Sequence, residues 1–66
     1  MEITVNGKPV DTREGICLMD FIKEKGLEPE RIVIEYNSAI AGREEWDEIF
    51  LKEKDCLEVL KFMGGG

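Results

Sequence analysis

The residues best suited to chemistry in this sequence are three consecutive glycines, Gly64, Gly65 and Gly66, which close it. Glycine has no Cβ, so an extended glycine run is narrow enough to enter a channel from which any side chain is excluded. A carboxylate on Gly66 would meet an attacking group without steric hindrance, as an enzyme that activates carboxyl groups with ATP requires. We therefore interpret residues 63–66 as a flexible tail that threads partner active sites, with Gly66 as the reactive group.

Composition alone is equally compatible with a frayed end or a cloning remnant, because short motifs often arise by chance. The glycines follow an apolar segment that ends in Phe62, without the serines of an ordinary flexible linker. This context favours the functional interpretation.

Other reactive side chains are scarce. The sequence has no histidine, which removes the commonest general base and the commonest metal ligand. Cys17 and Cys56 are too far apart in sequence for a zinc or dithiol motif. The predicted topology could bring them close together, which makes a regulatory disulfide the alternative, but we expect two small buried side chains in a reducing cytoplasm. We therefore expect no metal, no bound cofactor and no catalysis by the chain itself, which would be a protein substrate and carrier.

Composition narrows the class of partner. The net charge is −6, with 15 acidic against 9 basic residues, which argues against nucleic acids and anionic membranes. A hydrophobic content of 42% in 66 residues predicts one small globular domain. With no apolar run of membrane length and no leader peptide, we expect a cytoplasmic protein.

The elements that must present the tail follow from hydrophobic periodicity. Residues 1–6 alternate as in a half-buried strand, and Asn6-Gly7 is a strong hairpin signal. The returning strand over 8–12 contains Pro9, which cannot donate a ladder hydrogen bond and therefore predicts a sheet edge.

A helix should follow the hairpin, because Leu18, Phe21 and Ile22 form one apolar stripe. Gly26 suits the left-handed position after a helix end. The helix start is poorly marked, since Cys17 stands where a Ser, Thr or Asp would satisfy free N–H groups.

The second half predicts further strands over 31–37 and 56–62, with a short strand or turn at 38–42 between them. Trp46, Ile49 and Phe50 have helical spacing and predict a short helical turn, with Trp46 in the core.

These elements predict an α+β fold, a ubiquitin-like β-grasp roll. Its mixed sheet of four to five strands would have one main helix on one face and a short helical turn. The first and last strands would pair in parallel at the centre. Residues 1–62 would form this domain, followed by the tail at 63–66.

The last strand also predicts a partner-binding surface. If Leu57 faces the helix, Leu60 and Phe62 face away from it, and a single-layer sheet leaves that side uncovered. Together with Met63 and Tyr36 they would form an exposed apolar patch beside the tail. Shielding of this patch by neighbouring long side chains is the alternative.

The order and spacing of several motifs resemble the family of sulfur carrier proteins of thiamine biosynthesis (ThiS). The likeness covers nearly the whole chain and rests on ITVNG (3–7), LMDFIKEKGL (18–27), IEYNSAI (34–40), REEW (43–46) and FMGGG (62–66). The family often has glycine where this chain has Lys54, so the resemblance implies backbone strain there.

The resemblance implies a mechanism with several partners. An adenylyltransferase of the ubiquitin-activating type would use ATP to adenylate the carboxylate of Gly66. A sulfur relay from a cysteine desulfurase would convert it to a thiocarboxylate, from which thiazole synthase would take the sulfur. Two alternatives remain: the small subunit of molybdopterin synthase, and a β-grasp interaction module or protein-conjugating modifier that carries no sulfur.

Overall fold

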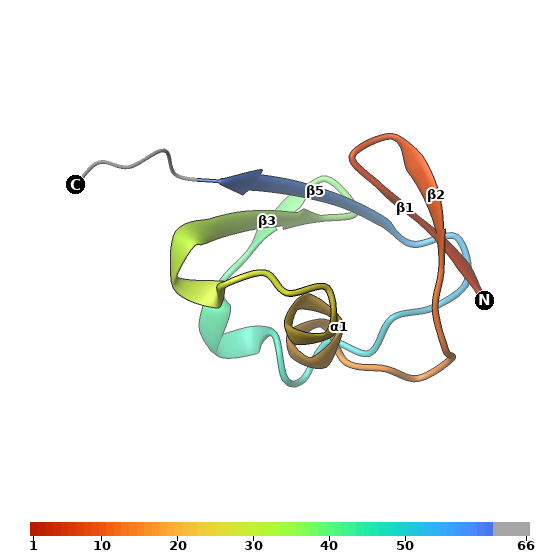
Figure 1. Ribbon diagram of the computed structural model, residues 1–66, viewed down its shortest axis with the longest axis horizontal. Helices are drawn as coiled ribbons and strands as arrows, with labels where there is room; N and C mark the ends of the chain where they lie inside the picture. Colours follow the sequence, from red (N-terminus) through yellow and green to blue (C-terminus); the bar gives the residue numbers. More distant parts are fainter. Residues whose placement is uncertain (62–66) are drawn as a thin grey trace.

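The chain folds as one mixed sheet with a helix across one face (Figure 1). The structure, a computed structural model, describes residues 1–61, so the predicted tail, Phe62 and Met63 lie outside the described residues. Within this part the sheet has five strands in the order β2-β1-β5-β3-β4. The elements are β1 (Glu2–Val5), β2 (Lys8–Asp11), α1 (Leu18–Glu24), the 3-10 turn η1 (Pro29–Arg31), β3 (Ile32–Tyr36), β4 (Ala39–Ala41), the 3-10 turn η2 (Arg43–Glu45) and β5 (Cys56–Lys61).

The topology confirms the predicted β-grasp arrangement. The first and last strands pair in parallel, with Thr4 opposite Cys56 and Val5 opposite Leu57. β5 thus lies at the centre of the sheet, between β1 and β3. β2, which contains Pro9, lies at a sheet edge as predicted.

The hairpin between β1 and β2 turns at Asn6 and Gly7. Their φ angles are 52° and 81°, and a tight two-residue hairpin requires positive φ at both central positions. Asparagine and glycine are the two residues that adopt this conformation at least cost, which is why this dipeptide predicts the hairpin.

α1 ends as predicted but begins in a different way. The N–H of Gly26 donates to the Lys23 carbonyl at 3.0 Å and that of Leu27 to the Ile22 carbonyl at 3.1 Å, and these two bonds form a Schellman cap. At the start, Cys17 makes no side-chain cap. Instead, carbonyls of the segment after η2 accept the first free N–H groups: Leu18 N–H to Ile49 at 2.8 Å and Met19 N–H to Trp46 at 3.1 Å. No helix in residues 1–61 has the length and apolar character needed to cross a membrane.

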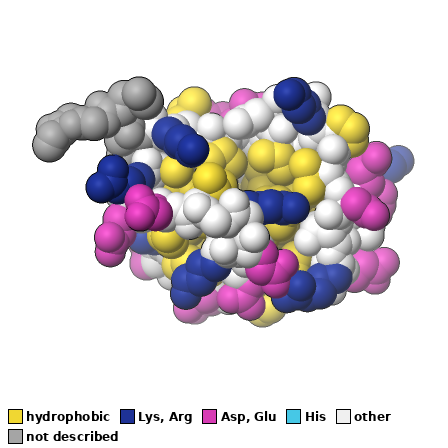
Figure 2. All heavy atoms as spheres, viewed as in Figure 1, with side chains coloured by type: hydrophobic (Ala, Val, Ile, Leu, Met, Phe, Trp, Pro, Cys, Tyr) yellow, Lys and Arg dark blue, Asp and Glu magenta, His cyan; other side chains and the backbone are white. Residues whose placement is uncertain are grey.

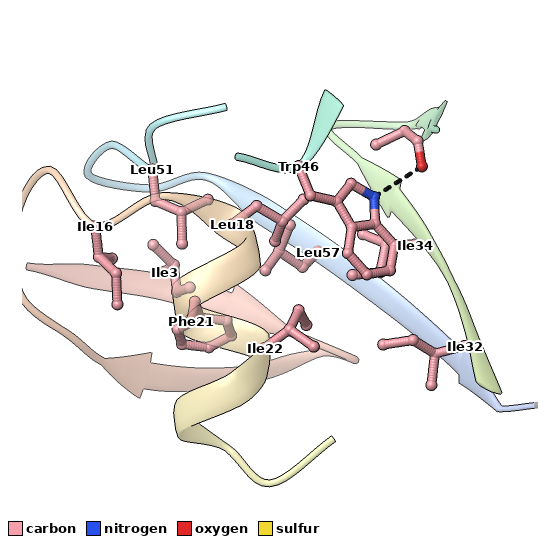
Figure 3. Packing of buried hydrophobic residues seen from close by; sticks show 11 residues of the cluster. Ile3, Ile16, Leu18, Phe21, Ile22, Ile32, Ile34, Trp46, Leu51 and Leu57 are labelled. Atoms are coloured by element: carbon pink, nitrogen blue, oxygen red, sulfur yellow. Dashed lines mark hydrogen bonds between the residues drawn. The ribbon is translucent and has the colours of Figure 1, made fainter. Parts of the chain in front are cut away.

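The core lies between α1 and the sheet (Figure 3). Trp46 is buried at the end nearest β4, where its indole N–H donates to the Ala41 carbonyl at 2.9 Å. The other buried apolar side chains come from every layer: Ile3, Ile16, Leu18, Phe21, Ile22, Ile32, Ile34, Ala41, Leu51 and Leu57. Burying each large one contributes about 1.5–3 kcal/mol, so this cluster holds the sheet and the helix together.

The prediction that a helical turn extends to Phe50 is wrong, because the observed turn is shorter. η2 ends at Glu45, and Phe50 is 58% exposed, with its backbone in an isolated bridge to Cys17. The carbonyls of Trp46 and Ile49 accept hydrogen bonds from α1, so they do not close further helical turns of their own.

The prediction that both cysteines are buried is also wrong. Cys17 is half-buried at the start of α1, and Cys56 is exposed. Cys56 neighbours the buried Leu57 in β5, and because side chains alternate along a strand it points away from the helix. The two thiols are free and lie on opposite sides of the sheet.

Candidate functional site

The candidate site is the end of β5, from which the chain continues toward Gly66. On one side β5 pairs with β3 from Leu57, opposite Tyr36, to Lys61, opposite Ile32. This pairing gives the last described residues a rigid support on the β3 side.

On the other side, pairing with β1 stops earlier. The backbone N–H of Asn6 donates to the Leu57 carbonyl at 2.9 Å. The Asn6 side chain then continues the contact: Val59 N–H donates to its Oδ1 at 2.7 Å, and its Nδ2 donates to the Val59 carbonyl at 3.3 Å. On the β1 side, a strand therefore holds β5 only as far as Leu57, and the Asn6 side chain takes over at Val59.

The start of β5 is held by a second asparagine. Asn37 has a φ of 50°, and its backbone N–H donates to the Cys56 carbonyl at 2.8 Å. Its Oδ1 accepts the N–H of Cys56 at 2.8 Å, and its Nδ2 donates to Asp55 Oδ1 at 3.2 Å. Asn37 thus anchors the end of β5 that lies away from the tail.

Asp55 is the only buried charged side chain in residues 1–61, with 5% of its surface exposed. Its Oδ2 accepts hydrogen bonds at 2.8 Å from both the Tyr36 hydroxyl and the Lys52 N–H. Burial by itself would raise the pKa of Asp55, but the hydrogen bonds from Lys52, Tyr36 and Asn37 outweigh it and lower the pKa below its usual value. The carboxylate therefore stays charged and ties the turn before β5 to the end of β3.

The side of the sheet opposite α1 carries the exposed apolar residues near the tail. Leu60 is 54% exposed and lies directly opposite Val33. Ile40 is 64% exposed and lies opposite Glu35, which in turn lies opposite Glu58. Because directly opposite residues of antiparallel strands share a face, Leu60, Val33 and Ile40 lie on one surface, which we call the free sheet face.

Tyr36 does not belong to the free sheet face, so its prediction as part of the patch is wrong. It lies opposite Leu57, and both therefore point toward the core side. Its hydroxyl is engaged with Asp55. Leu60 is exposed as predicted, whereas Phe62, Met63 and the glycines of the tail lie outside the described residues.

The free sheet face also contains an uncompensated pair of charges. Glu35 and Glu58 lie directly opposite one another, an arrangement that costs free energy. None of the ion pairs found in residues 1–61 includes either carboxylate. A cationic group brought by a partner would relieve this repulsion.

A shallow hollow lies beside the end of β5 on the other side of the sheet. Its volume is about 330 Å³, and it is lined by Gly26, Leu27, Glu28, Arg31, Ile32 and Lys61. Arg31 pairs with Glu28 at 2.8 Å on its rim. Basic and acidic side chains lie side by side at this end of the molecule (Figure 2), so the surface around the end of β5 is of mixed charge.

The role of the Asn6 side chain is the feature that sequence reasoning missed. Asn6-Gly7 predicts a hairpin from its backbone preferences alone, and nothing in that signal indicates what the amide group contacts. The parallel pairing of β1 with β5 brings it beside Val59, a residue distant in sequence.

Comparison with known proteins shows one consistent family. The ThiS family's sequence profile matches residues 3–66. The sulfur carrier protein ThiS of Bacillus subtilis (strain 168) is 31% identical over 65 residues, an alignment that covers 97% of this chain and 98% of that protein. The crystal structure of the thiamine biosynthesis protein (ThiS) from Geobacter metallireducens superposes with a TM-score of 0.84 at 36% identity and covers 100% of both chains.

A longer relative contains a segment similar to the whole chain. The thiazole synthase of Magnetococcus marinus is 35% identical over 66 residues, which is all of this chain but only 20% of that protein. The chain therefore spans about a fifth of the length of that relative.

Proposed function

This chain belongs to the ThiS family, and on that basis we propose that it is a sulfur carrier protein for thiamine thiazole biosynthesis. The observation that carries the proposal is the family match over residues 3–66, which runs through the glycine segment. The β-grasp fold, shared along the full length of the Geobacter protein, supports the same conclusion. In this role the chain is a substrate of other enzymes and performs no catalysis itself.

The proposed chemistry takes place on Gly66. A partner adenylyltransferase joins the carboxylate to the AMP part of ATP and releases pyrophosphate. The terminal sulfur of a persulfide, supplied through a relay from a cysteine desulfurase, then attacks the carbonyl carbon, and AMP leaves with the bonding electron pair. A second thiol of the relay then cleaves the S–S bond of this acyl disulfide, which supplies the two electrons that release the thiocarboxylate and leaves a disulfide in the relay. The resulting thiocarboxylate is a soft, ionised sulfur donor that cannot diffuse away. In this proposal ATP is consumed by the partner enzyme only, and the carrier acts in the cytoplasm, as expected from the sequence.

We propose thiazole synthase as the acceptor of the sulfur. In the Magnetococcus protein named thiazole synthase, a segment similar to this chain is part of the same polypeptide. Two protein segments joined in one polypeptide meet at a high effective concentration. Such a fusion therefore supports a direct interaction between the corresponding separate proteins.

The free sheet face is the proposed docking surface for the adenylyltransferase. Phe62 and Met63, which lie outside the described residues, stay predicted parts of this surface. Exposed apolar residues gathered on one face mark partner surfaces. Leu60 and Ile40 supply the apolar contact. The Glu35–Glu58 pair favours a partner whose docking surface places a cationic group against these two carboxylates.

Substitutions at Leu60 and at Phe62 test this surface. Leu60→Asp should lower kcat/KM for adenylation at least tenfold, a loss of about 1.4 kcal/mol in docking. Phe62→Asp should act in the same direction. Phe50→Asp is the matched control, because Phe50 is equally exposed but lies near the start of α1. Equal activity of the Leu60 and Phe50 variants, with both folded by circular dichroism, would contradict the assignment.

Intact mass spectrometry tests the function directly. The chain is incubated with the adenylyltransferase of its own organism, ATP and sulfide, and we expect one oxygen to be replaced by one sulfur at Gly66. A variant with one residue appended after Gly66 is the control and should remain unchanged. Sulfur uptake by the extended variant would refute the proposed site. Covalent attachment to other proteins would instead identify a modifier.

A further inference from the structure

We propose that Asn6 is a positioning residue for sulfur transfer, because its carboxamide takes the place of a missing strand residue and holds the last part of β5. This inference rests on the proposed function, since it concerns how the segment that leads to Gly66 leaves the sheet. It assigns to the hairpin a role beyond joining two strands.

The hairpin cannot support the end of β5 through its backbone. β1 pairs with β5 only at Thr4 opposite Cys56 and at Val5 opposite Leu57. The chain then turns away at Asn6 and Gly7, while β5 continues past the hairpin to Lys61 (Figure 1). From Val59 onward, no strand in residues 1–61 lies on that side of β5.

The Asn6 side chain fills this position as a peptide group would. A carboxamide has the same donor and acceptor as a backbone amide, and Asn6 uses both on one residue. Val59 N–H donates to Oδ1 at 2.7 Å, and Nδ2 donates to the Val59 carbonyl at 3.3 Å. The row of hydrogen bonds on the β1 side of β5 is thus extended to Val59 by a side chain, although β1 itself ends at Val5.

Beyond Val59 the support on this side ends. Alternation along β5 directs the N–H and C=O of Lys61 to the same side as those of Val59. Within residues 1–61 no hydrogen bond to either group is found on this side. Asn6 is therefore the last described contact that fixes the course of β5 on the side of β1.

Loss of this contact should act on docking and leave the chemical step unchanged. If the end of β5 detaches for part of the time, only the attached fraction presents the tail in the correct direction. The apparent affinity for the adenylyltransferase then falls by that fraction, whereas the reaction at Gly66 within the bound complex is unaffected. KM should rise, and kcat should not change.

Asn6→Gly is the direct test, with Asn37→Gly as the matched control. Both asparagines have positive φ, so glycine keeps each turn and removes only the side-chain hydrogen bonds. These bonds join Asn6 to Val59, and Asn37 to Cys56 and Asp55. Both substitutions should lower the melting temperature by a similar amount. In Asn6→Gly, amide exchange at Val59 should accelerate about tenfold, and KM for the carrier in ATP–pyrophosphate exchange should rise about fivefold with kcat unchanged. In Asn37→Gly, KM should remain within twofold of the wild-type value.

Asn6→Asp gives a second measurement if the glycine variant is too unstable. Aspartate tolerates positive φ and keeps the acceptor for Val59 N–H, but it loses the donor to the Val59 carbonyl. Its KM should lie between those of wild type and Asn6→Gly. Equal rises in KM for the Asn6 and Asn37 variants, or no rise for Asn6→Gly, would overturn the positioning role. If wild type itself is not adenylated, the proposed function fails instead.

Discussion

Lys54 has a backbone conformation that is unfavourable for a residue with a Cβ. Its φ is 72°, a conformation that costs a residue with a Cβ about 1–2 kcal/mol. Its backbone N–H nevertheless donates to the Glu2 carbonyl at 2.8 Å, which holds the turn before β5 against β1. The strain implied by the family resemblance at this position is thus confirmed.

Lys54→Gly should therefore stabilise the protein. Relief of the strain outweighs the extra flexibility of glycine in the unfolded chain, and we expect a gain of about 0.5–1 kcal/mol. Chemical denaturation measures it. Lys54→Ala is the control, because it removes the exposed side chain but keeps a Cβ at positive φ. A gain of the same size in both variants would show that the lysine side chain, and not the backbone, is responsible.

Asp55 should make stability depend on pH in the acidic range. Its pKa is lowered in the folded protein by hydrogen bonds that outweigh burial. The contribution of Asp55 to the free energy of unfolding is therefore complete above its pKa in the unfolded chain, about 3.9. This contribution is lost as the pH falls through the lower pKa of Asp55 in the folded protein.

Asp55→Asn should reduce the free energy of unfolding by about 1–3 kcal/mol at neutral pH. The new amide nitrogen must replace either Oδ1 or Oδ2 of Asp55. At Oδ1 it would face the donor Asn37 Nδ2, and at Oδ2 it would face the Lys52 N–H, so one hydrogen bond is lost in both cases. The difference from wild type should narrow below about pH 4 in urea titrations. Asp47→Asn, at an exposed carboxylate, is the control and should change the free energy of unfolding very little at neutral pH. A constant difference for Asp55→Asn would contradict the assigned cause.

At the level of single elements, α1 shows how tertiary contacts replace a local signal. The sequence predicts the apolar stripe and the glycine cap of α1, because both depend on residues within a few positions. The start of α1 could not be predicted in the same way. Carbonyls of Trp46 and Ile49, distant in sequence, satisfy its N–H groups, and the same contacts end the helical turn that their spacing predicts.

Cys17→Ser should strengthen this start. The N-cap residue has extended φ and ψ of −81° and 159°, which suits a hydroxyl that accepts from the N–H of Asp20. We expect a gain of about 0.5–1 kcal/mol in thermal or chemical denaturation. Cys56→Ser, at an exposed position of β5, is the control for loss of a thiol and should be nearly neutral. A loss of stability in Cys17→Ser alone would show that packing of its half-buried sulfur matters more than the cap.

For the whole molecule, the sequence predicts the architecture better than the functional surface. Strand alternation and the helical stripe determine which residues are buried, so the mixed sheet and its helix follow from the pattern. The pattern does not determine cross-strand register at the ends. Register places Tyr36 beside Leu57 on the core side, and it places Asn6 beside Val59.

Unfolding should involve the molecule as one unit. The buried cluster takes side chains from the sheet, from α1 and from the segment after η2, so no element retains a core without the others. At typical values the total stability is about 3–10 kcal/mol. Fluorescence of Trp46, the one tryptophan, and far-ultraviolet circular dichroism should give coincident urea transitions. An earlier fluorescence transition would indicate that the segment after η2 detaches first.

The central position of β5 in the sheet has a consequence for folding during synthesis on the ribosome. β5 is the last of the five described strands to be synthesised, yet β1 and β3 are joined in the sheet only through it. A nascent chain cannot close its sheet until this strand has emerged from the exit tunnel. A polypeptide truncated by premature termination within β5 would remain open to proteases and would never compete for an activating enzyme.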